Sequence, residues 1–385
     1  MEDAELLPWP HPHAGDLVST TRALDVVVAG TGFGRIYLDA LAKGDPAFRL
    51  AGILARGGTT SRALAEEAGV PLYTRIDDVP DSTDIVCVVV RSGATGGPGT
   101  ELARHFLQRG IHVLQEHPVH HSDIAACLQS ARQGHAAYAV NTLHPNLAPV
   151  RRFLAAASVL RDRQTPHYID ITCNSQMLYP LLDLAGRAVG GMRPWSFGEP
   201  ASAPAHPITT LHGHLRGIPL CLRVQNAVHP EDPDNHSLLL GQVGMGFDGG
   251  VLALPELHGP VLWHARLHAP RSDDGRLRMA GPGTGRLATA STTVLGPPPG
   301  DTWHHAFAET WPRAVLVALH GLRESIQTPV LRRTAAAWAI DVSQAWNDAS
   351  QRLGMPALIR PDEPQAVPVE LLHAATGAIA SMEPA

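Results

Sequence analysis

The chain has 385 residues, of which 44% are hydrophobic and 17% charged, and its formal net charge is −6. A mean hydropathy of −0.04 is typical of a soluble globular protein, and the negative charge gives no electrostatic reason to bind nucleic acid. The apolar runs fall short of the about 18 residues that a membrane-spanning helix needs, and two domains are expected at this length.

Residues 1–22 are acidic at first and then rich in proline and histidine. They lack the basic and apolar regions of a signal peptide, so we interpret them as a mobile extension. The cysteines are widely spaced and form no CxxC pair, which argues against a zinc site or a disulfide framework; they are Cys87, Cys127, Cys173 and Cys221. This pattern favours a reduced, cytoplasmic protein without a bound metal. Lys43 is the single lysine, so a mechanism that needs a catalytic lysine would have to use it.

From residue 24 onward, short β-branched runs alternate with helical stretches. Strands are expected at 24–30, 48–55, 71–74, 84–92, 111–116 and 136–145. The first helix contains Ile36, Leu38 and Leu41, and further helices are expected at 61–69, 99–110 and 121–134. Apolar strands that alternate with helices predict a parallel sheet covered on both faces. We therefore assign residues 23–150 to an α/β domain of the doubly wound, Rossmann type.

The pattern changes after a helix expected at 147–162. A strand at 167–175 and a buried helix at 176–191 precede strand-like runs with Gly/Pro turns at 211–228, 237–256 and 259–269. A loop is expected at 270–300, and two helices at 303–326 and 329–353 close the chain. Many strands without intervening helices predict a large, mostly antiparallel open sheet. We assign residues 151–385 to this C-terminal α+β domain.

A glycine-rich turn joins the first strand to the first helix. Glycine lets the backbone turn tightly and approach a pyrophosphate, whose charge is held by the helix N-terminus. The spacing is GxGxG, and Arg35 stands where the usual GxGxxG motif has its third glycine. The sequence therefore predicts dinucleotide binding by Gly30, Thr31, Gly32, Phe33, Gly34 and Arg35, with a structural turn as the alternative.

The end of the second strand distinguishes NAD from NADP. An acid about twenty residues beyond the glycines would accept hydrogen bonds from a ribose 2′-hydroxyl. Leu54 and Ala55 stand there instead, and Arg56 follows at once, with hydroxyl and guanidinium groups at Thr59, Thr60, Ser61 and Arg62. Guanidinium and hydroxyl groups suit a 2′-phosphate. We predict NADP(H) binding with Ala55, Arg56, Ser61 and Arg62 at the ribose; a solvated basic turn is the alternative.

Polar residues follow three later strands of the predicted sheet, at the end that faces a cofactor. Arg91 and Ser92 end the strand at 84–92, and Gly97 lies in the loop that follows; these three residues are predicted to run along the dinucleotide, with a flexible loop as the alternative. Glu116 and His117 end the next strand, and Asn141 and His144 end the one after it. Glu116, His117 and Asn141 are therefore also predicted on the cofactor side.

An imidazole titrates near neutrality and can give a proton to a substrate as a hydride arrives. His117 and His144 are the candidate proton donors, each as a histidinium, with packing as the alternative for both. Tyr179 and Asp183, on the helix at 176–191, are candidates to reach the substrate, with packing as the alternative for Tyr179. Other histidines lack a metal-binding pattern; among them are His264, His268, His304 and His305.

A Rossmann domain, an E-x-P sequence after the fifth strand and a C-terminal open sheet together resemble the Gfo/Idh/MocA oxidoreductases. The sugar dehydrogenases of that family usually have Glu-Lys-Pro, and a later helix with Asp and a His four residues on. Here His117 replaces the lysine, and Arg187 stands four residues after Asp183. The resemblance therefore does not extend to the residues that oxidise sugars.

A narrower resemblance, to the thiazolinyl imine reductases of siderophore biosynthesis, spans roughly residues 24–350. It rests on "GTGFGRIYL", "VVRSGATGGPGTELARHFLQRGIHVLQEHP", "NTLHPN", "HPEDPDNHSLLL" and "GPVLWHA". It implies that NADPH reduces the C=N bond of a thiazoline to a thiazolidine. It also implies a substrate tethered to a carrier-protein domain of a nonribosomal peptide synthetase. His144 stands where these reductases have a tyrosine, and related folds imply a homodimer.

Two other functions remain open from the sequence. The first is another NADP-dependent oxidoreductase of the same superfamily, acting on a free sugar or cyclic imine. The second is an NADPH-sensing binding protein without catalysis. A plain scaffold is disfavoured by the intact glycine turn.

Overall fold

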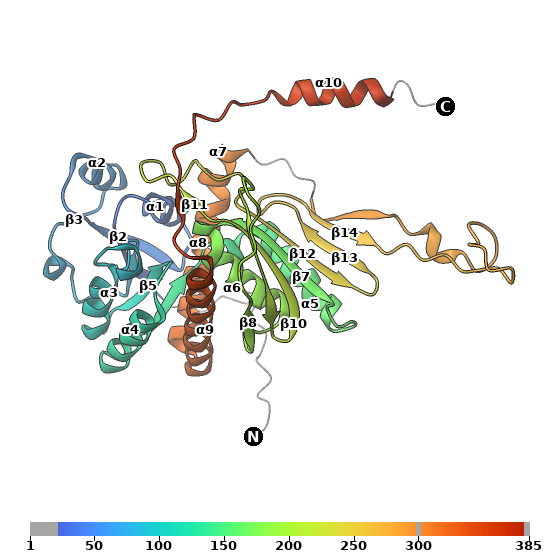
Figure 1. Ribbon diagram of the computed structural model, residues 1–385. Helices are drawn as coiled ribbons and strands as arrows, with labels where there is room; N and C mark the ends of the chain where they lie inside the picture. Colours follow the sequence, from blue (N-terminus) through green and yellow to red (C-terminus); the bar gives the residue numbers. More distant parts are fainter. Residues whose placement is uncertain (1–21, 298–301, 381–385) are drawn as a thin grey trace.

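The computed structural model describes residues 22–297 and 302–380. Apart from Arg22, the extension expected at 1–22 lies outside the described residues. Two sheets organise the molecule: a parallel sheet in the N-terminal half and a larger one in the C-terminal half, with the closing helices between them (Figure 1). No helix within the described ranges is long and apolar enough to cross a membrane.

The parallel sheet has the strand order β3-β2-β1-β4-β5-β6, as expected for a doubly wound fold. Its strands are β1 (Leu24–Ala29), β2 (Phe48–Leu54), β3 (Leu72–Tyr73), β4 (Ile85–Val88), β5 (His112–Glu116) and β6 (Tyr138–Asn141). Its helices are α1 (Arg35–Ala42), α2 (Thr59–Ala68), α3 (Gly99–Gln108) and α4 (His121–Gln133). The central strands are apolar on both faces because helices cover both, and β4 is buried throughout.

The two faces of this sheet are covered by helices from different parts of the chain. Val27 and Val86 pack in a core with α3 and α4, whereas Val26 and Val28 pack in a second core with α1. The same second core contains Leu319 and Leu322 of α8 (Trp311–Gln327). A closing helix of the C-terminal half therefore completes the layer over the Rossmann sheet.

The larger sheet has the order β15-β14-β13-β12-β7-β10-β9-β8. Only the neighbours β7 and β10 run parallel among its described strands, so the expected mostly antiparallel sheet is confirmed. The bounds are β7 (Tyr168–Asn174), β8 (Trp195–Phe197), β9 (Thr209–Leu215), β10 (Ile218–Gln225), β12 (Gly241–Phe247), β13 (Gly250–Leu254), β14 (Val261–Ala265) and β15 (Thr292–Leu295). A short parallel pair, β11 (Ala227–Val228) and β16 (Ala357–Leu358), lies beside it.

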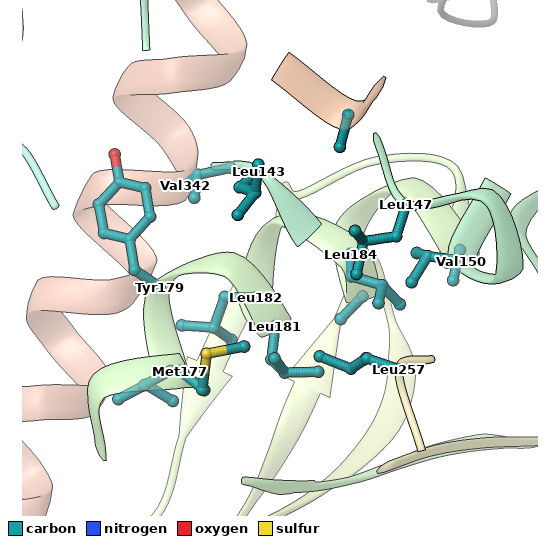
Figure 2. Packing of buried hydrophobic residues seen from close by; sticks show 14 of the residues in the cluster. Leu143, Leu147, Val150, Met177, Tyr179, Leu181, Leu182, Leu184, Leu257 and Val342 are labelled. Carbon is teal, nitrogen blue, oxygen red and sulfur yellow. The ribbon is translucent and has the colours of Figure 1, made fainter. Parts of the chain in front are cut away.

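Helices α5 (Ala148–Arg161) and α6 (Leu178–Val189) cover one face of the larger sheet. Figure 2 shows how Leu147 and Val150 pack with Leu181 and Leu184 of α6. Because α6 is apolar on nearly all sides, it is buried along its whole length. The interior between the sheet and the closing helices is therefore filled by side chains.

Short helix α7 (Trp303–His305), a π-helical turn (Ala306–Thr310), α8 and α9 (Pro329–Leu353) form the closing segment. The helices expected at 303–326 and 329–353 are confirmed in outline. A last helix, α10 (Val369–Ala380), was not expected. The loop expected at 270–300 contains β15, because the Thr-Thr-Val run pairs with β14 as an edge strand.

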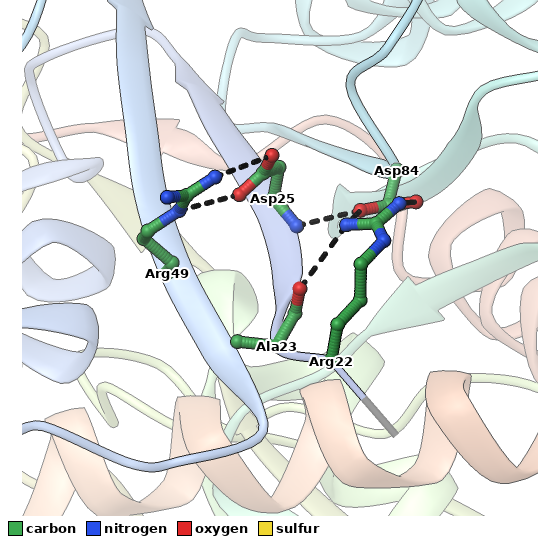
Figure 3. Close-up of polar contacts among 5 residues, drawn as sticks. All are labelled: Arg22, Ala23, Asp25, Arg49 and Asp84. Carbon is green, nitrogen blue, oxygen red and sulfur yellow. Dashed lines mark hydrogen bonds and ion pairs between the residues drawn. The ribbon is translucent and has the colours of Figure 1, made fainter. Parts of the chain in front are cut away.

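Ion pairs fix the amino ends of the first parallel strands, opposite the edge predicted to bind a cofactor. The Arg22 guanidinium donates two hydrogen bonds to Asp84, at 2.7 and 2.8 Å, and the Asp25 N–H donates to the same carboxylate at 2.7 Å. Arg49 binds Asp25 in the same bidentate way (Figure 3). These partly exposed ion pairs join the amino ends of β1 and β2 to the residue before β4, and we assign them a structural role.

Candidate functional site

The glycine turn after β1 has a shape that side chains would block. Gly30 has φ +100°, and a Cβ there would lie 2.4 Å from the Val89 carbonyl oxygen. A Cβ on Gly34 would lie 1.9 Å from the Gly30 oxygen, whereas nothing lies within 4 Å of a Cβ on Gly32. The turn therefore requires two of its glycines for its own folding, and it leaves open space over the third.

The start of α1 fits a bound anion. Gly34 precedes the helix without a side-chain cap, and its first turn contains no acid. The N–H groups and the dipole of a helix N-terminus attract phosphate, and no acidic residue of this first turn competes with an anion there. Phe33 and Arg35 are exposed beside this turn. These features fit the pyrophosphate of a dinucleotide.

The start of α2 fits a second phosphate. Leu54 is buried at the end of β2, Arg56 and Arg62 are exposed beside the helix start, and its first turn contains no acid. The exposed hydroxyls of Thr59 and Thr60 lie in the same turn. The Ser61 side chain is buried, and its hydroxyl donates to the Gly58 oxygen at 2.9 Å, so it supports the turn. Its contact with the ribose phosphate stays a prediction.

The loop after β4 is tied to the segment of His117. Ser92 is buried, and its hydroxyl donates to the Pro118 oxygen at 2.5 Å. The Ser92 side chain therefore joins two loops, and its contact with the dinucleotide stays a prediction. A Cβ on Gly97 would lie 2.2 Å from the Arg91 oxygen, so the glycine allows the loop to fold back on itself. The Arg91 side chain is exposed.

His117 ends β5 with one ring nitrogen engaged by two acceptors. Its Nδ1 lies 2.7 Å from Glu116 Oε1 and 3.1 Å from the Asn141 carbonyl oxygen. Because both partners accept hydrogen bonds, Nδ1 holds a proton in every protonation state of the ring. Nε2 is then the nitrogen that gains or loses a proton. The side chains of His117 and Glu116 are only 13% and 11% exposed.

Hydrogen bonds from Tyr37 and Asn141 hold the second oxygen of the Glu116 carboxylate. Its Oε2 accepts hydrogen bonds from the Tyr37 hydroxyl and, at 3.3 Å, from Asn141 Nδ2. Asn141 Oδ1 in turn accepts from the Leu143 N–H at 3.0 Å. Burial and the adjacent carboxylate raise the pKa of Tyr37 well above its ordinary value, so this hydroxyl stays protonated. Glu116 and Asn141 therefore orient His117, and their contact with the cofactor stays a prediction.

His144 is in a different state from His117. It is 5% exposed, and neither ring nitrogen has a hydrogen-bond partner. Burial, followed by the nearby His117 and His258, lowers its pKa to about 3. The ring is therefore neutral near pH 7, which corrects the expectation of a histidinium here. The two unpartnered nitrogens make His144 a neutral hydrogen-bonding group beside His117.

An aromatic wall, which the sequence did not predict, continues from His144. The Trp311 ring lies 5.9 Å from His144 and 5.8 Å from Phe33 of the glycine turn, between ring centroids. Trp311 Nε1 donates to His258 Nε2 at 2.8 Å, and this bond fixes the indole. Trp303 and Phe307 extend the wall and are 53% and 46% exposed. We define the aromatic wall as Phe33, His258, Trp303, Phe307 and Trp311.

Tyr179 and Asp183 lie behind the site rather than in it. Each is 1% exposed, and the Tyr179 hydroxyl is 3.5 Å from the Val119 oxygen. The Asp183 carboxylate accepts hydrogen bonds from Thr142, Arg187 and Trp338. All its acceptor positions face protein groups, so the predicted substrate contacts of both residues are corrected to packing and positioning.

The single lysine, Lys43, forms an ion pair away from His117. Lys43 Nζ pairs with Glu309 Oε1 at 2.9 Å, at the end of α1 away from His117. Within the described ranges, no three His, Cys, Asp or Glu side chains gather as a metal site would need. Together with Glu116, the two histidines supply ionisable groups next to the predicted cofactor edge.

Two family models match separate parts of the chain. Residues 24–142 match "Oxidoreductase family, NAD-binding Rossmann fold", of the Gfo/Idh/MocA group. Residues 164–264 match "Thiazolinyl imine reductase Irp3-like, C-terminal". No protein of curated function matches the chain by sequence.

Solved structures share the fold over most of the chain. A 3-ketoreductase from Actinomadura kijaniata, in complex with NADP and TDP-benzene, has a TM-score of 0.62 at 15% identity, covering 88% of this chain and 100% of its own. An oxidoreductase from Agrobacterium radiobacter, in complex with NAD+, L-tartaric acid and magnesium, has a TM-score of 0.59 at 13% identity, covering 84% and 94%. The UDP-N-acetylglucosamine 3-dehydrogenase from Acidithiobacillus ferrooxidans has a TM-score of 0.57 at 14% identity, covering 85% and 96%. At these identities the likeness shows the fold.

Proposed function

The chain belongs to the Gfo/Idh/MocA oxidoreductases and has the C-terminal domain of the thiazolinyl imine reductases, and on this premise we propose that it uses NADPH to reduce a thiazoline C=N bond to a thiazolidine. The observation that supports this most directly is the Glu116–His117 pair at the end of β5. An imidazole held by a carboxylate 2.7 Å away stands where a sugar dehydrogenase of the family would have a lysine.

NADPH is the proposed cofactor because the residues at both phosphate positions fit it. The open space over Gly32 and the acid-free start of α1 suit the pyrophosphate. Arg56 and Arg62, with no acid at the end of β2, suit a 2′-phosphate. When bound, NADPH supplies the hydride that reduces the ring carbon.

His117 is the proposed proton donor. Its Nδ1 is held by Glu116 and Asn141, so Nε2 is the nitrogen that delivers a proton. The imidazolium N–H breaks and a new N–H forms on the ring nitrogen, while the hydride adds to the ring carbon; the two balance the reduction of C=N. The Glu116 carboxylate stabilises the positive charge before the transfer.

His144 and the aromatic wall lie next to His117 and form a further part of the proposed site. A neutral His144 can donate or accept one hydrogen bond without introducing a competing charge. The rings of Phe33 and Trp311 bring the glycine turn and α8 together, and they keep an apolar boundary beside the histidines. Such a boundary limits the access of water to the reacting bond.

The full proposal includes the partners and the compartment. The thiazoline is presented by a carrier-protein domain of a nonribosomal peptide synthetase during siderophore assembly, in the cytoplasm, and the enzyme is a homodimer. The sugar-oxidising alternative is disfavoured because Lys43 is paired with Glu309 and Asp183 is fully bonded inside the protein.

The test is a reductase assay on a synthetic hydroxyphenyl-thiazoline thioester, following the loss of NADPH absorbance. We expect turnover by the wild type, and a fall in kcat of about 10²- to 10⁴-fold in His117→Gln, the range for the loss of a general acid. NADPH affinity should stay the same, and the exposed His212→Gln serves as the control. Oxidation of polyols with NADP+, without reduction of any thiazoline, would refute the proposal.

A further inference from the structure

Two rings of the aromatic wall, Trp303 and Phe307, are here called the outer rings. Trp303 is 53% exposed and Phe307 is 46% exposed, and the reaction proposed above uses neither. We propose that the outer rings bind the substituent on the reacting carbon of the substrate, and that they select substrates in which this substituent is a planar, unsaturated ring. The inference rests on the proposed function, because it assigns the substrate specificity of that same site.

The rings form a continuous row from the proposed proton donor to the surface. Between ring centroids, His144 lies 6.5 Å from His117 and 5.9 Å from Trp311. Phe307 follows at 4.8 Å from Trp311, and Trp303 follows at 6.3 Å from Phe307. Each spacing is within the range of aromatic rings in contact. A substrate that extends along this row from His117 therefore meets aromatic rings as far as the surface.

A π-helical turn aligns the outer rings with the inner one. Trp303, Phe307 and Trp311 are four residues apart, and the π-helical turn Ala306–Thr310 lies between the first and the last. Four residues of an α-helix overshoot one full turn by about 40°. A π-helical turn contains more residues, so this drift is smaller and the three side chains stay closer to one line. Such turns are rare and occur frequently at functional sites.

His258 holds the wall in place from inside the protein. Its Nδ1 lies 3.3 Å from a Glu256 carboxylate oxygen, and its Nε2 accepts a hydrogen bond from Trp311 Nε1 at 2.8 Å. The Trp303 ring meets the same imidazole edge to face, at 5.0 Å between centroids. The His258 side chain is 9% exposed. The wall is therefore preorganised, and a ligand does not have to order it on binding.

The family assignment gives the outer rings no role. The two matched segments are residues 24–142 and 164–264, and both outer rings follow them in the chain. Exposed aromatic side chains that lie together mark a surface that a ligand or partner covers. Phe33 of the glycine turn, 40% exposed and 5.8 Å from Trp311, borders the same cluster. Because the cluster joins the glycine turn to the histidines, it favours the substrate as the occupant.

The chemistry of the C=N bond favours a flat occupant. The thiazoline carbon that accepts the hydride also bears the substituent, whereas the thioester is attached on the other side of the ring nitrogen. An unsaturated ring on that carbon conjugates with the C=N bond and lies in its plane. Flat rings bind aromatic side chains by offset stacking or edge-to-face contact. A flexible thioester arm would lose more conformational entropy on the same surface.

The experiment measures kcat and KM on two synthetic thiazoline thioesters that differ only in the substituent, phenyl or methyl. We expect the wild type to have the lower KM for the phenyl substrate. Trp303→Ala and Phe307→Ala should each raise that KM about tenfold, the size of one aromatic contact with the apolar area that it buries. The KM for the methyl substrate and both kcat values should stay the same, which separates lost binding from a damaged fold.

Two further variants serve as controls. Trp303→Phe keeps an aromatic ring and should keep most of the preference for phenyl. Met279→Ala removes an apolar side chain that is 81% exposed in the loop between β14 and β15. It should behave like the wild type on both substrates.

Tryptophan fluorescence gives a readout that does not need turnover. With the full chain saturated by NADP+, 2-phenylthiazoline should quench the wild type and should quench Trp303→Phe less. The methyl analogue, 2-methylthiazoline, should quench neither. If no thiazoline is reduced but this difference is found, the proposed function is wrong and the binding site for a planar ring stands.

Three results overturn the inference while leaving the reductase function intact. The first is a wild type with equal KM for the phenyl and methyl substrates. The second is a KM that rises equally for both substrates in the alanine variants, since the outer rings would then contact the thioester arm or support the fold. The third is equal quenching of the wild type and Trp303→Phe by 2-phenylthiazoline.

Discussion

His117 and His144 lie edge to face with 6.5 Å between their ring centroids, yet their surroundings make them chemically different. His117 has a carboxylate 2.7 Å from Nδ1, whereas both nitrogens of His144 lack a partner. Burial and the neighbouring histidines hold the pKa of His144 at about 3. Both histidines follow the end of a strand, so the sequence does not distinguish them. In the structure, His117 has a carboxylate partner and is the proposed proton donor, whereas His144 is neutral.

The first prediction concerns Glu116. Glu116→Gln keeps the size of the side chain and its contact with Tyr37 but removes the negative charge beside His117. We expect kcat for the thiazoline to fall, by less than the about 10²- to 10⁴-fold expected for His117→Gln, because the ring remains but its charged form is less stabilised. NADPH titration should give an unchanged affinity.

Glu67→Gln, an exposed change on α2, is the control for this experiment. If Glu116→Gln lost NADPH binding and kept kcat, Glu116 would be a cofactor ligand after all. The assignment of the Glu116–His117 pair would then be wrong.

The second prediction concerns the pH dependence of stability. His144 is neutral in the folded protein down to pH about 3, whereas the unfolded chain binds a proton near pH 6.5. Below pH 6.5 the unfolded state therefore binds more protons, and the free energy of unfolding falls as the pH drops, by at most about 1.4 kcal/mol per pH unit from this residue. His144→Leu should flatten this acid slope in urea unfolding measured from pH 7 to 4.5.

The exposed His212→Leu should leave the slope as in the wild type. Equal slopes in His144→Leu and the wild type would mean that His144 is hydrated and titrates in the folded protein. The neutral state proposed for the reaction would then have to be abandoned.

The third prediction separates the two nicotinamide cofactors. Arg56→Ala and Arg62→Ala remove the exposed guanidinium groups at the start of α2. A hydrogen bond to a charged group contributes about 1.5–3 kcal/mol, so each change should weaken NADPH binding about 10- to 100-fold. Fluorescence titration should show no change for NADH, which lacks the 2′-phosphate. Arg75→Ala is the control, and equal losses for both cofactors would contradict the 2′-phosphate assignment.

Local sequence patterns predicted the fold because the features they report are local. Apolar strands that alternate with helices predicted the parallel sheet, and the glycine spacing placed Gly30 and Gly34 in a turn that no other residue fits. The strand-end position of His117 was predictable for the same reason, since the carboxyl ends of parallel strands meet at one edge.

The sequence could not give the roles that depend on distant contacts. The hydrogen bonds that Tyr37 of α1 makes with Glu116 and Asn141 join residues about 80 and 100 positions apart, and no local pattern predicts them. Phe33 and Trp311 come from opposite ends of the chain, and no periodicity joins them. The low pKa of His144 arises from burial by several elements at once, which a histidine at a strand end does not reveal.

The fourth prediction compares two ion pairs of the same composition. Arg187 binds Asp183 and lies over the Trp338 ring, 5.5 Å from its centroid, and Arg193 binds Asp341 and lies over Trp195, 4.7 Å away. The first pair is buried, with side chains 18% and 2% exposed, and the second is open, at 58% and 22%.

Asp183→Asn leaves the buried Arg187 charge without its carboxylate, and should cost about 3–5 kcal/mol of unfolding free energy in urea, whereas Asp341→Asn should cost about 0–1 kcal/mol. Equal losses would contradict the burial of the first pair. Because Asp183 also accepts from Thr142, whose neighbour Leu143 has φ +54°, the loss should loosen the turn that sets His144. A lower kcat in folded Asp183→Asn, absent from Asp341→Asn, would show that this buried carboxylate positions the site as well as stabilising the fold.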